Sequence, residues 1–410
     1  MTRVLHTADW HLGARLVEHE RTEEHRRFLD WLLACVRREK PDVLLIAGDV
    51  FDTSNPPASA IQLYFDFLSQ MREAAHTRVI VTGGNHDSPQ TLNAPSGLLR
   101  RLDVHVHGCP PEHLDNCLSD YDDVVVCAVP FLRERDVRTA TPGQSSEQIA
   151  AEIRAGITRY YRTVLERARE RAAGRAILTS GHLTVVGATT SDSEREIHIG
   201  NLGAVGADCF EGFDYVALGH LHKPQAVGNR STVRYSGSPV PLSFDDGANA
   251  KSVVLIDFVR GEPPRVRTVP LPVFRPLVRV ACAPEGLDAA LGAVASHPGT
   301  LPAWVEVTLE AALPAFELER KVRETADAHG VCVLKCALTR VGEDHTLDLG
   351  AGPEKSLADM APAAVFLERL RSAGIDPQSD EGGLLAHTFL ELLSRHSAAE
   401  REARAELAAR

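Results

Sequence analysis

Residues 43–52 read VLLIAGDVFD, five apolar residues that lead directly into glycine and aspartate. An unbroken apolar run of this length is typical of a strand buried on both faces of a sheet. Helical spacing over Arg26–Arg38 precedes this strand, and a second helix is predicted over Ala58–Arg72 after it. Further strands are predicted over Val4–Thr7 and Arg78–Thr82. The resulting βαβαβ order favours an α/β sheet with mostly parallel strands.

The next part of the chain is richer in strands than in helices. One long charged helix is predicted over Glu147–Arg171. Strands are predicted over Val124–Val129, Ala176–Thr179, Tyr215–Leu218, Val233–Tyr235 and Ser252–Phe258. Because the late strands lack long helices between them, we expect some of them to pair antiparallel. The predicted fold class is therefore α/β (α+β), with a two-sheet sandwich flanked by helices over residues 1–270.

A change of composition at Pro263–Pro276, which contains several prolines, marks the end of this domain. Three strands alternate with two helices over residues 276–340, which predicts a small α/β capping domain. Residues 341–357 are polar and contain glycine, as in a linker. Two amphipathic helices are predicted within residues 358–410. They can pack on their own domain or dock on a partner, and their isolation behind a linker favours docking.

Composition places the chain among ordinary globular proteins, with 410 residues, 44% hydrophobic and 24% charged. A formal net charge of −12 argues against a protein that coats nucleic acid by bulk attraction, but does not exclude a nuclease. The start of the sequence lacks a signal segment and no apolar stretch is long enough to span a bilayer, so we expect a cytoplasmic protein. Eight scattered cysteines are expected to be free, with Cys332 and Cys336 buried on one strand face.

Five short polar segments each follow a predicted strand. They are Asp9-Trp10-His11, Gly48-Asp49, Gly84-Asn85-His86-Asp87, Gly181-His182 and Gly219-His220-Leu221-His222. Functional groups are expected at the carboxyl ends of strands in open α/β sheets, and the glycines permit tight turns there. All five segments in this order form a far more specific pattern than any one of them.

The chemistry follows from the types of ligand in these segments. Aspartate, asparagine and histidine supply oxygen and nitrogen without thiolate, which suits manganese, iron or zinc in a functional site. Seven ligands exceed the needs of one tetrahedral ion and suit two ions that share a ligand. Asp49 is the natural bridge, because one carboxylate can reach both ions. Such pairs lie roughly 3.5–4 Å apart and stabilise both attacking and leaving oxygens at phosphorus.

The sequence resembles the calcineurin-like metallophosphoesterases and, among them, the SbcD family of bacterial nuclease subunits. The matching motifs are Thr7–Gly13, Gly48–Asp52, Gly84–Pro89, Gly219–His222 and Tyr235–Pro239. The resemblance implies one metal held by Asp9, His11, Asp49 and His222, and another held by Asp49, Asn85, His182 and His220. Mn²⁺ is the expected ion.

The resemblance also implies roles for residues outside the metal shell. His86 is expected to donate a proton or stabilise the transition state at the scissile phosphate. Asp87 is expected to orient His86. Some relatives carry a further histidine just after the Gly-Asp motif, where this chain has Asp52, so Asp52 is given no catalytic role.

The function implied is a DNA nuclease, exonucleolytic on duplexes and endonucleolytic on single strands and hairpins. It would work with an SbcC-like ATPase in DNA repair and recombination. Family likeness further implies a homodimer through Arg26–Arg38 or Ala58–Arg72, within a heterotetramer. Two alternatives stay open: a phosphoesterase acting on small phosphate esters or phosphoproteins, and a non-catalytic scaffold.

Several other histidines and arginines invite a functional interpretation. His6 is expected to be a core residue of the first strand, and His198 is expected to be structural. Arg15 is a candidate for phosphate contact, whereas Arg133 and Arg135 suit phosphate contact and a helix-start or salt-bridge role equally. His105, His107 and His113 are expected at surface or strand positions, because no glycine turns bring them together.

Overall fold

The computed structural model describes residues 1–74, 76–139, 141–190, 204–310 and 315–339, together with scattered positions between 366 and 389. The chain divides into two compact units, Met1–Val341 and Gly342–Arg410. The predicted linker lies outside the described residues, and so does most of the predicted tail. The predicted domain boundaries at 276, 341 and 358 therefore stay predictions.

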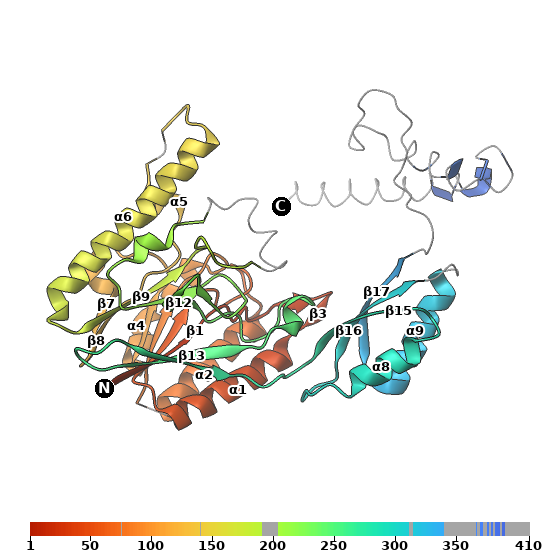
Figure 1. Ribbon diagram of the computed structural model, residues 1–410, viewed down its shortest axis with the longest axis horizontal. Helices are drawn as coiled ribbons and strands as arrows, with labels where there is room; N and C mark the ends of the chain where they lie inside the picture. Colours follow the sequence, from red (N-terminus) through yellow and green to blue (C-terminus); the bar gives the residue numbers. More distant parts are fainter. Residues whose placement is uncertain are drawn as a thin grey trace. The chain divides into compact units, whose positions relative to one another are not determined.

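Two six-stranded sheets form the body of the first unit (Figure 1). The first sheet has the order β14 (Arg265–Pro270), β13 (Ser252–Phe258), β1 (Thr2–Thr7), β4 (Val43–Ala47), β5 (Arg78–Thr82) and β6 (Val104–His107). Strands β1, β4, β5 and β6 are parallel, as the βαβαβ pattern predicts. Strands β13 and β14 extend the sheet antiparallel. All five residues of β4 are buried, in agreement with its unbroken apolar sequence.

The second sheet has the order β11 (Gln225–Val227), β12 (Arg230–Tyr235), β10 (Tyr215–Gly219), β9 (Ala176–His182), β8 (Val124–Cys127) and β7 (Leu118–Asp120). The central strands β8, β9, β10 and β12 are parallel, whereas β11 and β7 pair antiparallel. The prediction that some late strands pair antiparallel is confirmed by β13, whereas the predicted strands in the centre of the second sheet are parallel.

The two sheets pack face to face around one shared core. Val4 and Val43 of the first sheet belong to the same buried cluster as Val126 and Leu178 of the second. His6 links the sheets, because its Nδ1 lies 3.3 Å from the Tyr215 hydroxyl. Burial lowers the pKa of this imidazole to about 3, so it is neutral. The prediction of a core histidine is confirmed.

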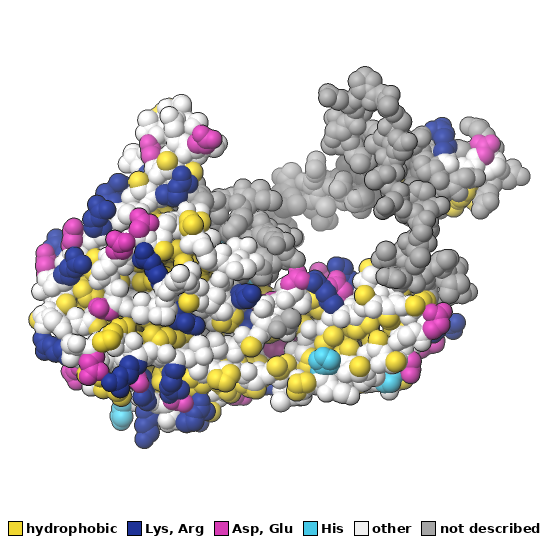
Figure 2. All heavy atoms as spheres, viewed as in Figure 1, with side chains coloured by type: hydrophobic (Ala, Val, Ile, Leu, Met, Phe, Trp, Pro, Cys, Tyr) yellow, Lys and Arg dark blue, Asp and Glu magenta, His cyan; other side chains and the backbone are white. Residues whose placement is uncertain are grey.

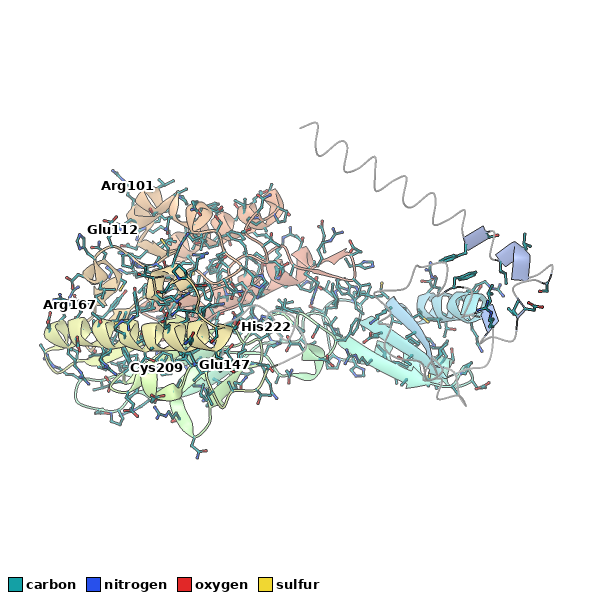
Figure 3. All side chains as sticks on the ribbon, turned by 90° about the horizontal axis from the view of Figure 1, so that it is seen from above. Arg101, Glu112, Glu147, Arg167, Cys209 and His222 are labelled. Carbon is teal, nitrogen blue, oxygen red and sulfur yellow. The ribbon has the colours of Figure 1, made fainter. Side chains whose placement is uncertain are left out.

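Helices cover the outer faces of the sandwich. Helices α1 (Thr22–Glu39) and α2 (Ala58–Ala74) lie side by side on the first sheet (Figure 1). Helix α6 (Ser146–Ala172) covers the second sheet and begins with a capping box between Ser145 and Gln148. Figure 3 shows α6 lengthwise between Glu147 and Arg167. The shorter helices are α3 (Pro89–Asn93), α4 (Ser96–Leu99) and α5 (Glu134–Val137).

A separate three-stranded parallel sheet follows the sandwich. Its strands are β15 (Leu277–Cys282), β16 (Trp304–Glu310) and β17 (Cys332–Thr339), with α8 (Leu287–Ala295) and α9 (Ala315–His329) between them. Leu291, Val305 and Val322 belong to a core of its own. The predicted alternation of three strands and two helices is confirmed, and we refer to residues 277–339 as the cap.

One expectation for the cap is wrong. Cys332 is half-buried and Cys336 is exposed, although alternation predicts that both lie on one buried face. The pairing of β16 with β17 shifts register between Val305 and Glu306, so that Lys335 rather than Leu334 lies opposite Glu306. The extra residue reverses the side of the sheet on which the following side chains point. The described cysteines are free, as predicted.

In the tail, the described positions 366, 370–371, 382–385 and 388–389 are helical. The rings of Phe366 and Phe389 stack with centroids 4.1 Å apart, so the two predicted apolar stripes meet there. Within the described residues, no helix has the length and apolar character needed to cross a membrane. On the face shown in Figure 2, Lys and Arg side chains are interspersed with Asp and Glu.

Candidate metal centre

All seven predicted ligands lie at one end of the sandwich, where strands from both sheets finish. Asp9 and His11 follow β1, Asp49 follows β4, and Asn85 follows β5, all in the first sheet. His182 ends β9, and His220 and His222 follow β10, in the second sheet (His222 is labelled in Figure 3). The ligands meet because the parallel strands of both sheets have their carboxyl ends at this edge.

One group of contacts surrounds Asn85. Its side-chain oxygen lies 2.9 Å from His182 Nε2 and 3.1 Å from His220 Nδ1. His182 Nε2 also lies 3.2 Å from Asp49 Oδ2. These four side chains are those that the resemblance assigns to one ion.

A second group of contacts surrounds His11. Its Nε2 lies 3.6 Å from Asp49 Oδ2, and its ring centroid lies 4.9 Å from that of His222. Asp9, His11 and Asp49 each offer a ligand atom within 4.8 Å of the others. The same oxygen of Asp49 therefore faces His11 on one side and His182 on the other. This is the position that a bridging carboxylate requires.

The burial of these groups fits a cation. Asp9 is 0% exposed, and its Oδ2 has no hydrogen-bond partner in the described part of the chain. The Nε2 atom of buried His11 likewise lacks one there. A buried polar atom without a partner costs about 1–3 kcal/mol, and more when charged. Metal coordination would satisfy both atoms, so the residues present fit the metal pair that the motifs imply.

The backbone at the site adopts unusual conformations. Asp9, His11, Asp49 and His220 all have positive φ, at 53°, 46°, 46° and 98°. Non-glycine residues seldom adopt this region, and such strain concentrates at functional sites. Glycines allow the neighbouring segments to approach, since a Cβ on Gly84 would lie 2.1 Å from Asp49 Oδ1. The Gly-Asp and Gly-Asn-His motifs thus reflect direct contact between their loops.

The charges in the metal-free site perturb one another strongly. Burial raises the pKa of Asp9 to about 7. Burial opposes protonation of His182, but the Asp49 carboxylate outweighs it and raises the pKa of His182 to about 9. Burial opposes ionisation of Asp49, but the nearby imidazoles, His182 above all, hold its pKa well below the ordinary value. Burial and the neighbouring His11 lower the pKa of His222. These acidic and imidazole groups share protons where a cation would supply the positive charge.

His86 lies beside the ligands, as predicted. Its backbone N–H donates to Asp49 Oδ1 over 3.0 Å, and its Nδ1 lies 2.7 Å from the carbonyl oxygen of Asp52. Because a carbonyl only accepts, Nδ1 carries the proton and donates it there. The Nε2 atom is then the second functional atom of the ring. His86 is half-buried, and with His11 and His222 it lines a cleft of about 570 Å³.

Asp87 does not orient His86 through its carboxylate. Its oxygens accept the backbone N–H groups of Gly84, Val50 and Phe51, over 2.8, 3.2 and 3.0 Å. It therefore joins the loop after β4 to the loop after β5. The predicted contact with His86 is therefore wrong, because the carboxylate is taken up by backbone N–H groups of these two loops.

Asp52 is the residue whose importance the sequence did not reveal. Its carboxylate lies 3.1 Å from His11 Nδ1, while its carbonyl holds His86. It touches both imidazoles and so acts as a positioning residue. The signal available in the sequence was its place three residues after Asp49, within the same loop.

The remaining candidates are the histidines and arginines outside the ligand set. His105 and His107 are half-buried on β6, and His113 is exposed. Arg133 begins α5 and stacks on Phe131, with its Nη2 3.4 Å from the Asp87 carbonyl, which agrees with the helix-start interpretation. Arg15 lines the cleft beside His86. His198 lies outside the described residues.

Two family models match the sequence of this chain. Residues 2–224 match the family model for calcineurin-like phosphoesterases, and residues 273–373 match the model for a type 5 capsule protein repressor C-terminal domain. The chain is 33% identical over 396 residues to the SbcD subunit of nuclease SbcCD from Escherichia coli K12, covering 95% of this chain and 98% of that protein.

Two further relatives are also SbcD subunits of nuclease SbcCD. The Rhodobacter capsulatus protein is 35% identical over 386 residues, covering 89% of this chain and 93% of the relative. The Bacillus subtilis protein is 36% identical over 287 residues, covering 68% and 71%. A solved dimetal phosphatase from Danio rerio covers 65% of this chain and 95% of its own at 11% identity, with a TM-score of 0.39 that is too low to bear on the argument.

The fold and the matching family model define a calcineurin-like phosphoesterase, a metal-dependent hydrolase of phosphate esters. Within that class, the chain belongs to the SbcD family of nuclease subunits, as its extended similarity to three such proteins establishes. The resemblance first seen in the short motifs is thereby confirmed over most of the chain.

Proposed function

We propose that this chain is the nuclease subunit of an SbcCD-type complex and hydrolyses DNA phosphodiesters with two divalent ions, Mn²⁺ in the first instance. The observation that carries the proposal is the convergence of seven oxygen and nitrogen ligands beside His86 in a cleft. A scaffold without activity would not need a half-buried imidazole held at Nδ1 next to an intact ligand set.

The proposed division of ligands follows the two groups of contacts. Asp9, His11 and His222 would hold one ion, while Asn85, His182 and His220 would hold the other. Asp49 would bind both, because its Oδ2 lies between His11 and His182. Bound at these positions, such ions activate water and neutralise charge that develops on the phosphate.

The side chains of this chain supply the rest of the chemistry. The Asp52 carbonyl accepts the Nδ1 proton of His86, which would leave Nε2 to exchange a proton at the leaving oxygen. Asp87 holds the loops that carry Asp49 and Asn85 at a fixed spacing. Asp52 also holds His11 through its carboxylate, and the His182 Nδ1 atom lies 3.1 Å from the Ala47 carbonyl, which orients that ring in the same manner.

Basic side chains from two domains line the cleft. Arg15 comes from the nuclease domain, and Arg279 and Lys335 come from the cap. Asp52, Asp245 and Glu306 line the cleft as well; Arg279 pairs with Asp245 and Glu306, and Lys335 pairs with Glu306. Basic side chains spread over two domains can follow several phosphates of a strand, which a single small ester does not offer.

The test uses the full chain with an SbcC-like ATPase, Mn²⁺ and linear duplex DNA. We expect degradation from the ends, and loss of it in His86→Ala with Mn²⁺ content unchanged. Intact DNA with the wild-type complex would contradict the proposal. Faster turnover of a simple aryl phosphodiester than of DNA would instead favour the small-ester alternative. Equal activity of His86→Ala and wild type would remove the proposed role of His86.

The proposed partners rest on the family and on the tail. We propose that the helices beyond Leu357 dock on an SbcC-like ATPase, supported by the helical positions around Phe366 and Phe389. Deletion of residues 358–410 should abolish co-purification with that partner, and a retained complex would contradict it. The predicted capping domain over 276–340 would then steer DNA, with 341–357 as linker. We propose that the protein works in the cytoplasm, where its substrate lies.

A homodimer through α1 and α2 is proposed as part of a heterotetramer. Phe65 is 37% exposed on α2, and Arg26, Asp30 and Leu63 line a groove between the two helices. Phe65→Glu should convert a dimer to a monomer in light scattering at micromolar concentration. A wild-type chain that is monomeric with its ATPase bound would contradict the proposal.

A further inference from the structure

A buried lysine lies directly behind one predicted metal ligand. Lys251 precedes β13 and is 7% exposed. Its Nζ donates to the carbonyl oxygen of His222 over 3.0 Å and to Ser238 Oγ over 3.2 Å. It also lies 2.6 Å from both carboxylate oxygens of Asp246. An ammonium has three N–H donors, and these partners account for all of them.

These contacts fix the backbone of His222 from two directions. The His222 carbonyl accepts the Lys251 ammonium and also the Ser238 N–H, over 3.1 Å. The segment around His222 follows the end of β10 and has no regular secondary structure to hold it. Ligands must be held within about 0.5 Å of their working geometry, and the two donors provide that restraint.

Asp246 organises the loop from which the lysine comes. It is 0% exposed, and its Oδ2 accepts the Leu242 N–H over 3.1 Å. Its Oδ1 accepts from the Asn249 side chain over 3.3 Å. The carboxylate therefore closes residues 242–251 into a compact loop and neutralises the buried ammonium, without which the charge would be strongly unfavourable.

The same loop carries contacts with the cap. Asp245 forms an ion pair with Arg279 of β15. Phe244 belongs to a buried cluster with Leu277 and Trp304 of the cap. The loop thus touches the cap on one side and the His222 carbonyl on the other, through residues close together in the chain.

We infer that Lys251 and Asp246 are positioning residues: they fix His222 for metal binding and join the metal centre to the cap through one loop. The inference rests on the proposed metal site and concerns residues outside its ligand set. A buried ion pair is weak evidence for stability, since apolar residues often replace such pairs without loss. Its placement on the carbonyl of a ligand is what points to positioning.

The test compares Mn²⁺ binding by Lys251→Met with that of the wild type, using titration calorimetry and manganese electron paramagnetic resonance. Methionine keeps most of the length of the lysine side chain and removes the donor and the charge. We expect a loss of roughly 10–100-fold in affinity at one of the two sites, as for the removal of other partners that orient ligands. The second site should keep its affinity. Lys251→Arg, which retains the charge and several donors, should restore most of the loss.

Arg3→Met is the matched control. Arg3 forms an ion pair with Asp257 over 2.6 Å and lies near the start of β1, away from the end that leads to Asp9. The Arg3→Met variant should have a lower melting temperature than the wild type and unchanged Mn²⁺ affinities at both sites. A purely structural role for Lys251 predicts the same behaviour for Lys251→Met.

Wild-type affinity at both sites in Lys251→Met would therefore overturn the inference, whatever its melting temperature. If that variant does not fold, the double variant Lys251→Met, Asp246→Asn is judged by the same criterion, because it leaves no unpaired carboxylate and still lacks the donor to the His222 carbonyl. An equal loss at both sites would also contradict the assignment to His222. Failure of the wild type to bind Mn²⁺ would instead refute the proposed metal site itself.

Discussion

Asp52→Ala separates two contacts that one residue makes with two imidazoles. The substitution removes the carboxylate that lies 3.1 Å from His11 Nδ1. It leaves the backbone carbonyl that accepts the Nδ1 proton of His86 over 2.7 Å. Metal binding through His11 should therefore weaken, while the orientation of His86 should persist.

The size of the effect follows from the exposure of the contact. Hydrogen bonds to charged groups contribute about 1.5–3 kcal/mol. The Asp52 side chain is 35% exposed, so solvent screening places this bond at the lower end of that range. About 1.5 kcal/mol corresponds to roughly a tenfold loss of Mn²⁺ affinity at the site that includes His11.

The assay is DNA cleavage as a function of Mn²⁺ concentration, with calorimetric titration in parallel. Asp52→Ala should require roughly tenfold more Mn²⁺ for half-maximal activity and should reach nearly the wild-type rate at saturation. Asp52→Asn keeps an acceptor oxygen, so its Mn²⁺ requirement should lie between those of the wild type and Asp52→Ala. Unchanged Mn²⁺ dependence would refute the contact with His11. A saturating rate as low as that of His86→Ala would show that the carboxylate is needed for His86 as well.

Three further predictions concern the same site. His86→Asn should lower the cleavage rate by about 10²–10⁴-fold with Mn²⁺ stoichiometry intact, and a rate near that of the wild type would exclude general acid catalysis by His86. Asp87→Ala leaves three buried N–H groups without their acceptor, at a cost of about 1–3 kcal/mol each. Part of this cost is offset because the substitution also removes a carboxylate whose burial is unfavourable, since burial raises the pKa of Asp87 to about 6. Urea denaturation should show a loss of about 2–4 kcal/mol, and a loss below about 0.5 kcal/mol would contradict those contacts. Mn²⁺ affinity should rise with pH up to about 9, because the pKa of His182 is raised to about 9 and binding must displace its proton. Calorimetry in buffers of different ionisation enthalpy should detect proton release at pH 7, and its absence would contradict this titration.

Much of the fold could be predicted because its strands have distinctive sequences. The runs at Val43–Ala47 and Ser252–Phe258 are apolar enough to identify strands with their observed bounds. The edge strands β6, β7, β11 and β14 were missed. Each of them is short or has few buried residues, so the apolar signal that identifies a strand is weak there.

The candidate site could be predicted as a set of residues, but not as a set of contacts. Ligand types and glycines in five motifs identify which side chains gather at the strand ends. The sequence does not show that Asp87 turns back onto Gly84, or that Asp52 serves His86 through its backbone carbonyl. Such contacts depend on loop conformation, including the positive φ of Asp49, which no periodicity encodes.

The most direct test of the two-metal account is anomalous diffraction from crystals of the full chain soaked in Mn²⁺. The account predicts two peaks roughly 3.5–4 Å apart, with Asp49 bound to both. One ion should also bind Asp9, His11 and His222, and the other Asn85, His182 and His220, with His86 bound to neither. A single peak, or two peaks without a shared Asp49 ligand, would contradict it.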